Sequence, residues 1–152
     1  MNAVPLALYT VAFAAYVWHF ARRQAAIGRA ATTLLVAGAL AHTFVIGMQT
    51  MDLGHVPVMT RTSYISTFVW MLTLAYLYTE MTTDERAMGA FILPLAIALQ
   101  IIPVLNSGTV AGEERASVLR GPIFGLHVSS LLLSYASFAL AAVIGITYML
   151  LF

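Results

Sequence analysis

Five apolar runs, each long enough to cross a membrane, dominate this chain of 152 residues. A helix needs about 20 apolar residues to span the hydrocarbon core of a bilayer. A soluble chain this short buries only about two-thirds of its surface on folding, so it could not hide so much apolar surface. We therefore predict an all-α, polytopic integral membrane helical bundle. The runs are Val4–Ala21, Ala30–Met51, Ser63–Met81, Ala87–Leu105 and Pro122–Phe152.

The composition supports this class of protein. Hydrophobic residues make up 61% of the chain and charged residues only 9%, whereas a soluble domain carries about 25% charged residues. The chain has no cysteine, which excludes a disulfide or a thiolate metal site within it. Neither a basic run nor an aromatic stacking platform is present, so we expect membrane lipid and no nucleic acid as a partner.

The distribution of arginines predicts the orientation. Arg22, Arg23 and Arg29 lie in the first connection, and short connections rich in positive charge face the cytoplasm. The N-terminus and the second and fourth connections are then outside. Arg115 and Arg120 in the fourth connection argue mildly against this orientation.

We expect residues 1–152 to form a single transmembrane domain without a soluble part. The last run, Pro122–Phe152, contains no charge. It is longer than a hydrocarbon core of about 30 Å requires, and it ends without a polar anchor. We therefore expect the sequence to be the N-terminal part of a larger module. Gly112–Arg120 is expected to form a short amphipathic helix on the outer surface.

Histidines are the main candidates for chemistry. We expect no carboxylate inside a span, which leaves imidazole as the only strong metal ligand in the membrane region. His55 and His127 share the outer side under the orientation above, where such a pair could hold a metal ion or a haem iron from two faces. His19 is expected to be an interfacial residue beside the arginines. The four histidines are His19, His42, His55 and His127.

Two interpretations stay open for His42, near the middle of the second run. Gly38 lies one helical turn away on the same face. The missing side chain leaves space beside the ring either for a flat ligand or for a neighbouring helix. In the second case His42 would be a hydrogen-bonding residue between helices.

His127 begins a face of small residues. The small side chains that follow it recur at spacings of three and four, so they lie on one side of a helix. Such a face permits close helix packing, or it forms a pocket for a planar group; the sequence alone does not separate these. The residues are Ser130, Ser134, Ser137 and Ala141.

Two other functions find little support. A hydrolase would need an acid to orient the histidine of a catalytic triad, and none is expected in the membrane. A transporter typically has broken helices and polar residues at mid-membrane. Pro94, Gln100 and Pro103 in the fourth run offer a faint version of that pattern, which keeps a small transporter as the weakest alternative.

Two motifs resemble the cytochrome c assembly family, CcsA/ResC-like proteins with HemX-like and YpjD-like relatives. The first is Gly54-His55-Val56-Pro57, which leads into a helix with Phe68-Val69-Trp70; the second is Leu126-His127-Val128-Ser129, followed by Leu133-Ser134-Tyr135-Ala136. The first motif departs from the family at Met59-Thr60-Arg61-Thr62. The family's Trp-rich segment ending in Trp-Asp, and the second outer histidine after it, are not in this sequence.

The resemblance implies haem chemistry in a bacterial inner membrane. A CcsA-like protein would bind or present b-type, non-covalent haem in transit at the outer face for attachment to apocytochrome c, as part of a haem lyase. His127 would be an axial iron ligand, His42 would lie on the haem path, and His55 belongs to the first motif. A CcsB/ResB-like membrane subunit would be a partner. The missing Trp-rich segment favours the alternative, a non-catalytic HemX-like scaffold or regulatory subunit.

Overall fold

The protein is an all-helical bundle, which confirms the predicted fold class. The computed structural model describes residues 3–106 and 121–151, and all regular structure in those ranges is helical. The predicted amphipathic segment Gly112–Arg120 lies outside the described residues. The elements are α1 (Ala3–Arg22), α2 (Ala25–Leu53), α3 (Arg61–Thr83), the short 3₁₀ helix η1 (Arg86–Met88), α4 (Gly89–Leu105) and α5 (Pro122–Leu151).

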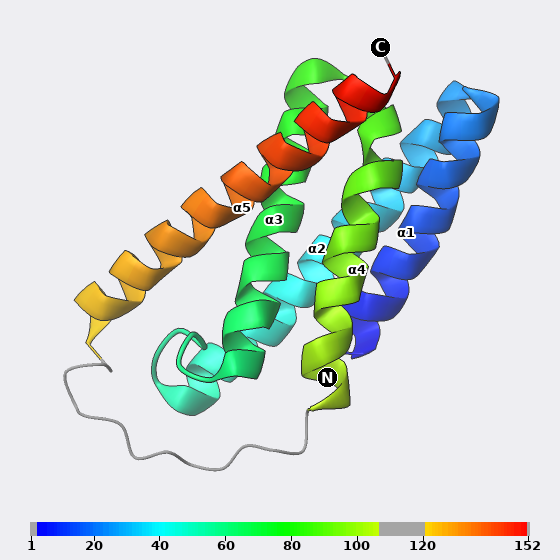
Figure 1. Cartoon of the computed structure of the whole chain (residues 1–152). Coiled ribbons are helices and arrows are strands. Elements are labelled where there is room, and N and C mark those ends of the chain that lie inside the picture. The colour runs from blue at the N-terminus through cyan, green and yellow to red at the C-terminus, as the bar shows by residue number, and fades with distance from the viewer. Residues whose placement is uncertain (1–2, 107–120, 152) are drawn as a thin grey trace.

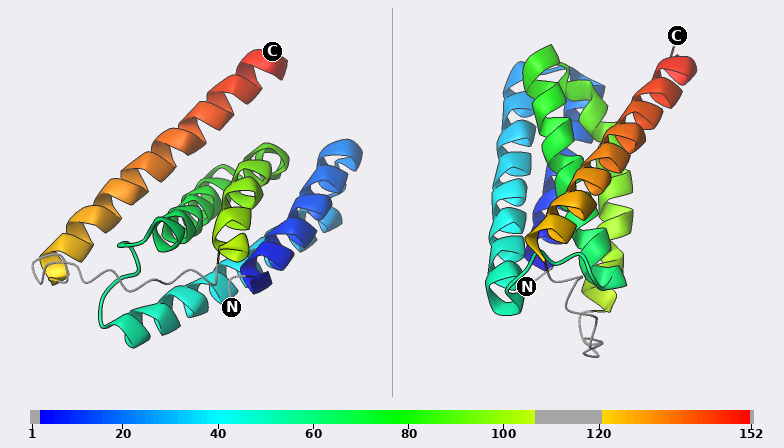
Figure 2. Two further views of the ribbon diagram at one scale, coloured as in Figure 1. Left: turned by 60° about the horizontal axis from the view of Figure 1, so that its bottom comes forward. Right: turned by 90° about the vertical axis from the view of Figure 1, so that its left-hand side faces the viewer.

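Consecutive helices run in opposite directions and pack side by side (Figure 1). α1 packs against α2 and α4, and α3 packs against α2, α4 and α5. α5 lies at the edge of the bundle and crosses it obliquely (Figure 2). We call the end with the α2–α3 connection, residues 54–60, the histidine end; the starts of α1 and α5 lie there too. The opposite end, with the α1–α2 connection at residues 23–24, is the arginine end.

Four segments of the described chain are long and apolar enough to cross a membrane: α1, α2, η1 with α4, and α5. The fifth predicted span, α3, is not among them. It has 23 residues, so its polarity and not its length sets it apart. Several of its polar side chains are buried inside the bundle, where other helices provide hydrogen-bond partners. They are Ser66, Thr67, Thr73 and Glu80.

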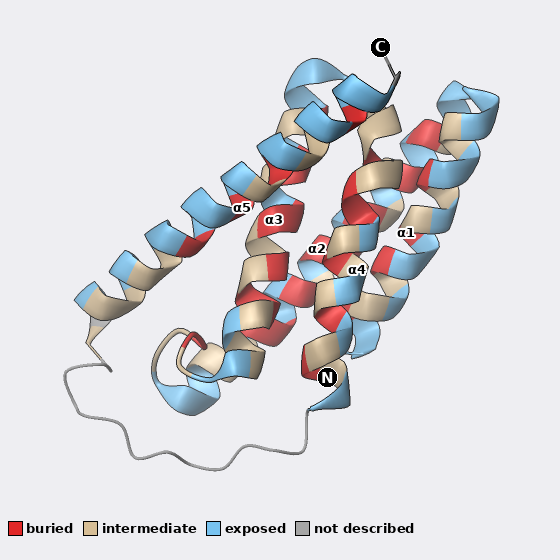
Figure 3. Ribbon diagram, viewed as in Figure 1, coloured by how far each residue is buried: buried red, intermediate tan, exposed pale blue. Residues whose placement is uncertain are grey.

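The core lies between α1, α2, α3 and α4, as Figure 3 shows by burial. Tyr9 and Tyr16 of α1 are fully buried there, and the Tyr16 ring packs edge-on against Tyr76 of α3, with 6.0 Å between the ring centroids. α5 contributes much less: most of its large apolar side chains are exposed. In a membrane such exposed apolar surface faces lipid or another helix.

The prolines do not break α4. The helix is continuous from Gly89 to Leu105 through Pro94 and Pro103. The interrupted helix that would favour a transporter is therefore not formed here.

Candidate functional site

A cleft of about 400 Å³ opens at the histidine end, between the α2–α3 connection and the first turns of α5. His55 lines it, and most of its other lining is apolar. The further lining residues are Thr50, Gly54, Val56, Val58, Met59, Gly121, Phe124, Gly125, Leu126 and Ser129.

The connection that carries His55 is held in place from both sides. Gly54 ends α2 in the left-handed conformation, with φ of 72°, and its amide donates to the Thr50 carbonyl at 2.9 Å. Glycine adopts this conformation without steric cost, so the chain can turn sharply at that point. Further on, the buried Thr67 hydroxyl donates to the Pro57 carbonyl at 2.9 Å. The start of α3 thus anchors the connection.

The ring of His55 has a defined hydrogen-bond role. Its Nδ1 lies 3.0 Å from the carbonyl oxygen of Val56. A carbonyl oxygen only accepts, so Nδ1 carries the hydrogen and donates. In the neutral ring, Nε2 then presents its lone pair, which is the form that binds metals.

His127 lies at the same end but does not line the cleft. α5 contributes Gly125, Leu126 and Ser129 to the lining, whereas His127 is exposed. At about 100° per residue, position 127 is on nearly the opposite side of the helix from positions 125 and 129. The structure therefore brings the two outer histidines to one end without bringing them into one cleft.

His42 is a fully buried hydrogen-bonding residue between helices. Its Nδ1 lies 2.9 Å from the Tyr9 hydroxyl of α1, and its Nε2 lies 3.0 Å from the Ser66 hydroxyl of α3. Gln100 of α4 donates to the same Ser66 oxygen at 3.5 Å. Both ring nitrogens are thus engaged, and the network ties four helices together.

The space beside His42 is filled by a neighbouring helix. A Cβ added at Gly38 would meet the Tyr9 ring at 2.9 Å. Of the two interpretations of the Gly38–His42 face, the structure therefore shows helix packing and leaves no room there for a flat ligand. The role of His42 on a haem path stays a prediction.

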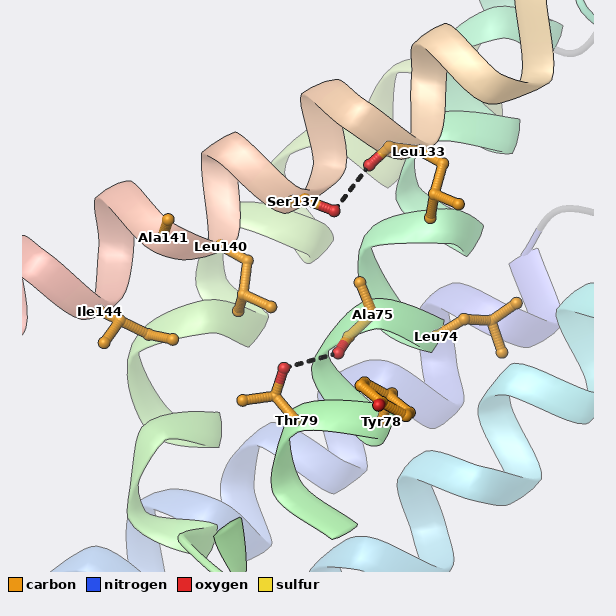
Figure 4. A pocket seen from close by; sticks show the side chains of 9 residues that line it. All are labelled: Leu74, Ala75, Tyr78, Thr79, Leu133, Ser137, Leu140, Ala141 and Ile144. Atoms are coloured by element: carbon orange, nitrogen blue, oxygen red, sulfur yellow. Dashed lines mark hydrogen bonds between the residues drawn. The ribbon is translucent and has the colours of Figure 1, made fainter. Parts of the chain in front are cut away.

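The small-residue face of α5 is exposed and only partly borders a groove. Ser137 and Ala141 line a groove of about 610 Å³ between α3 and α5 (Figure 4). Ser130 and Ser134 lie outside it. The Ser137 hydroxyl donates to the Leu133 carbonyl at 2.9 Å, and the Thr79 hydroxyl across the groove likewise donates within its own helix. Because these hydroxyl hydrogens are already used, the groove offers a bound group mainly apolar contact.

Glu80 is a buried acid that the sequence analysis missed, so the expectation that no carboxylate lies inside a span is wrong. Its side chain is 2% exposed. The Tyr16 hydroxyl donates to its Oε2 at 2.6 Å, and the Thr32 hydroxyl donates to its Oε1. Arg86 Nε lies 4.0 Å from Oε1. Two hydroxyl donors and a nearby guanidinium satisfy the carboxyl oxygens, which explains how α3 accommodates a buried acid.

Glu80 stands within the predicted run Ser63–Met81, and a pattern in the sequence could have shown that it is buried. Ser66, Thr73 and Glu80 are spaced by seven residues, about two turns of a helix, so they follow one side of α3. Among the described residues, no histidine binds this carboxylate. It binds hydroxyls from α1 and α2, and therefore does not supply the missing acid of a catalytic triad.

The remaining histidine, His19, lies at the arginine end. Its Nδ1 donates to the Gln24 carbonyl at 3.0 Å and so closes the turn between α1 and α2. Its ring also packs against Gly28, where an added Cβ would meet it at 2.9 Å. The interfacial location expected for His19 stays a prediction. Within the described ranges, no three His, Cys, Asp or Glu side chains gather as a metal cluster.

The fold defines a multi-pass helical membrane protein. Comparison with known proteins shows which proteins the chain is similar to. The chain is similar to proteins named cytochrome c biogenesis protein CcsA. Such a protein from Heterosigma akashiwo is 32% identical over 84 residues, which are 54% of this chain and 26% of that protein. Another from Trieres chinensis is 24% identical over 108 residues, which are 70% of this chain and 35% of that protein.

The names of these relatives support the resemblance to CcsA proteins. The aligned part of the chain spans about a quarter to a third of their length. No protein-family model and no solved structure matches the chain. The HemX-like and YpjD-like relationships stay predictions.

Proposed function

We propose that the protein handles haem in cytochrome c biogenesis, binding or presenting it at the histidine end with His127 as an iron ligand. The similarity to CcsA proteins carries this proposal. His127 stands in the second of the two motifs that resemble the family. Its exposed position near the start of α5 makes the imidazole accessible to haem and to a partner protein.

The proposed chemistry divides between the cofactor and the chain. Bound haem would supply the iron and the vinyl groups that react with cysteine thiols of apocytochrome c. The chain would hold the iron through imidazole nitrogen and position the ring at the end of the bundle. Because His127 faces away from the cleft that His55 lines, a second iron ligand would come from outside the described residues, for example from a CcsB/ResB-like partner subunit.

The proposed location is a bacterial inner membrane with the N-terminus and the histidine end outside. Arg22, Arg23 and Arg29 lie at or next to the α1–α2 connection, at the other end of the bundle. Positive charge in short connections favours the cytoplasmic side. The haem would be non-covalent and in transit toward an acceptor outside.

The test is the optical spectrum of the detergent-purified protein after haemin is added, compared with that of His127→Ala. We expect a Soret band, with sharp α and β bands after reduction, and a lower haem content in the variant. An unchanged spectrum and haem content in His127→Ala would overturn the assignment of His127.

A non-catalytic membrane scaffold is the second candidate. One observation favours it: α5 buries few side chains and presents a long apolar surface, on which a helix of another subunit could pack. A parent protein that takes up no haem, yet co-purifies with a membrane subunit through α5, would support the scaffold and exclude haem handling.

A further inference from the structure

The cleft at the histidine end contains a histidine prepared for a metal. Resting on the proposed function, we infer that this cleft is a second haem position, in which Nε2 of His55 binds the iron independently of His127. The sequence motif includes His55 without giving it a role. The role follows from the hydrogen bond, the chain segment and the cleft that surround the His55 ring.

The ring of His55 is already oriented for metal binding. The Nδ1–H of His55 is fixed by the Val56 carbonyl at 3.0 Å, and no hydrogen bond joins Nε2 to another described residue. Histidines that bind metals commonly donate their other ring nitrogen to a carbonyl or carboxylate, which fixes both the tautomer and the ring orientation. His55 meets this requirement before any metal is present.

The segment that carries His55 is held in place by its own contacts. The Val58 amide donates to the Val56 carbonyl at 2.9 Å, and the Val58 side chain is buried. Val56 also approaches α5 closely, since an added Cβ at Gly125 would meet it at 3.6 Å. A ligand held on such a support loses little freedom when it binds, because its position is already set.

The volume and the apolar lining of the cleft suit one edge of a porphyrin. A volume of about 400 Å³ lies within the roughly 300–1,000 Å³ usual for small-molecule sites. Val56, Phe124 and Leu126 offer apolar surface to the edge of a flat ring. The cleft is open, so the polar edge of the porphyrin would stay outside. This matches a cofactor that has to be released again.

His55 and His127 occupy separate positions at the histidine end. His127 does not line the cleft, and it lies nearly opposite Gly125 and Ser129 around α5. One iron in the cleft therefore cannot reach both rings without rearrangement of the helix. The geometry predicts two separable positions.

The experiment measures haem bound per chain in the purified full chain titrated with haemin. It compares the parent, His55→Gly, His127→Ala and the double variant. We expect about two haem groups in the parent, about one in each single variant and none in the double variant. Imidazole added to His55→Gly should restore the lost haem, which a merely structural role of His55 would not allow. Circular dichroism checks that each variant keeps its helical content.

His19→Gln is the matched control, because His19 makes the same Nδ1 hydrogen bond to a carbonyl at the opposite end. It should bind haem like the parent. If His55→Gly binds as much haem as the parent, or if imidazole restores nothing, the cleft assignment is overturned while the proposed function stands. If only His55→Gly loses haem, the cleft stands and the His127 assignment falls. A parent without any haem overturns both.

Discussion

The two ends of the bundle use polar side chains in opposite ways. At the arginine end, Glu80 is buried, and hydroxyls from two other helices bind both of its oxygens. At the histidine end, His55 has one engaged ring nitrogen and a cleft beside it. Saturated polar groups hold helices together, whereas an unsaturated one beside a cavity is available for a ligand. The contrast predicts that the arginine end contributes mainly stability and that the histidine end is available for binding.

Glycines sharpen the contrast. An added Cβ at Gly89, near the arginine end, would lie 2.5 Å from the Tyr16 ring. At Gly125, beside the cleft, the nearest atom would be 3.6 Å away. The position of Gly89 is thus packed too tightly to accept one methyl group, whereas the position of Gly125 is not.

The largest effect is expected from Glu80→Ala, which should lower the free energy of unfolding by about 3–5 kcal/mol. Breaking a buried charged network costs this much because the remaining partners stay buried without one another. Thermal and denaturant unfolding in detergent, followed by circular dichroism, would measure it.

Asp84→Asn is the control for Glu80→Ala, since Asp84 also pairs with Arg86, at 2.7 Å, but is 80% exposed. An exposed pair contributes at most about 1 kcal/mol. Equal effects of the two substitutions would contradict the special role of the buried carboxylate.

Gly89→Ala is expected to have an intermediate effect, a loss of about 1–3 kcal/mol, because overpacking forces a neighbour to move. The Tyr16 ring would have to shift, and with it the hydroxyl that binds Glu80. The same unfolding measurement applies.

Gly47→Ala is the matched helical control, since an added Cβ there meets nothing within 4 Å. It should be neutral or slightly stabilising, because alanine is the better helix former by up to about 1 kcal/mol. A Gly89→Ala protein as stable as Gly47→Ala would show that this end is not tightly packed.

A smaller loss of stability than that of Glu80→Ala or Gly89→Ala is expected from His55→Ala. It removes one partly exposed hydrogen bond, worth about 0.5–1.5 kcal/mol. The unfolding transition should therefore stay close to that of the parent. A loss as large as that of Glu80→Ala would mean that His55 is a structural residue, and the division of roles between the two ends would fail.

Much of the fold could be predicted from the sequence. The apolar runs correspond to the five long helices within a few residues at most ends, for example Val4–Ala21 against Ala3–Arg22. The alternation of runs and connections also predicted that His55 and His127 lie at the same end. The error at Glu80 arose because α3 was treated as an apolar run, although its polar residues repeat along one side.

Less of the candidate site than of the fold could be predicted from the sequence. Gly38 beside His42 allowed a ligand or a helix, and only the position of Tyr9 in α1 decided between them. Likewise, no spacing within α5 could show which of its sides would border the α2–α3 connection. That depends on how α5 packs against α3.

By itself, the sequence determined a helical membrane bundle, because apolar runs of this length are stable only when lipid or other helices cover them and when each backbone amide bonds within its own helix. It also determined which residue types are available for chemistry. Only the tertiary structure decided their roles, because the fate of a polar side chain depends on partners from other helices. Glu80 and His42 have such partners and connect the helices from inside the bundle. Nε2 of His55 has none among the described residues, and we propose that it binds a ligand.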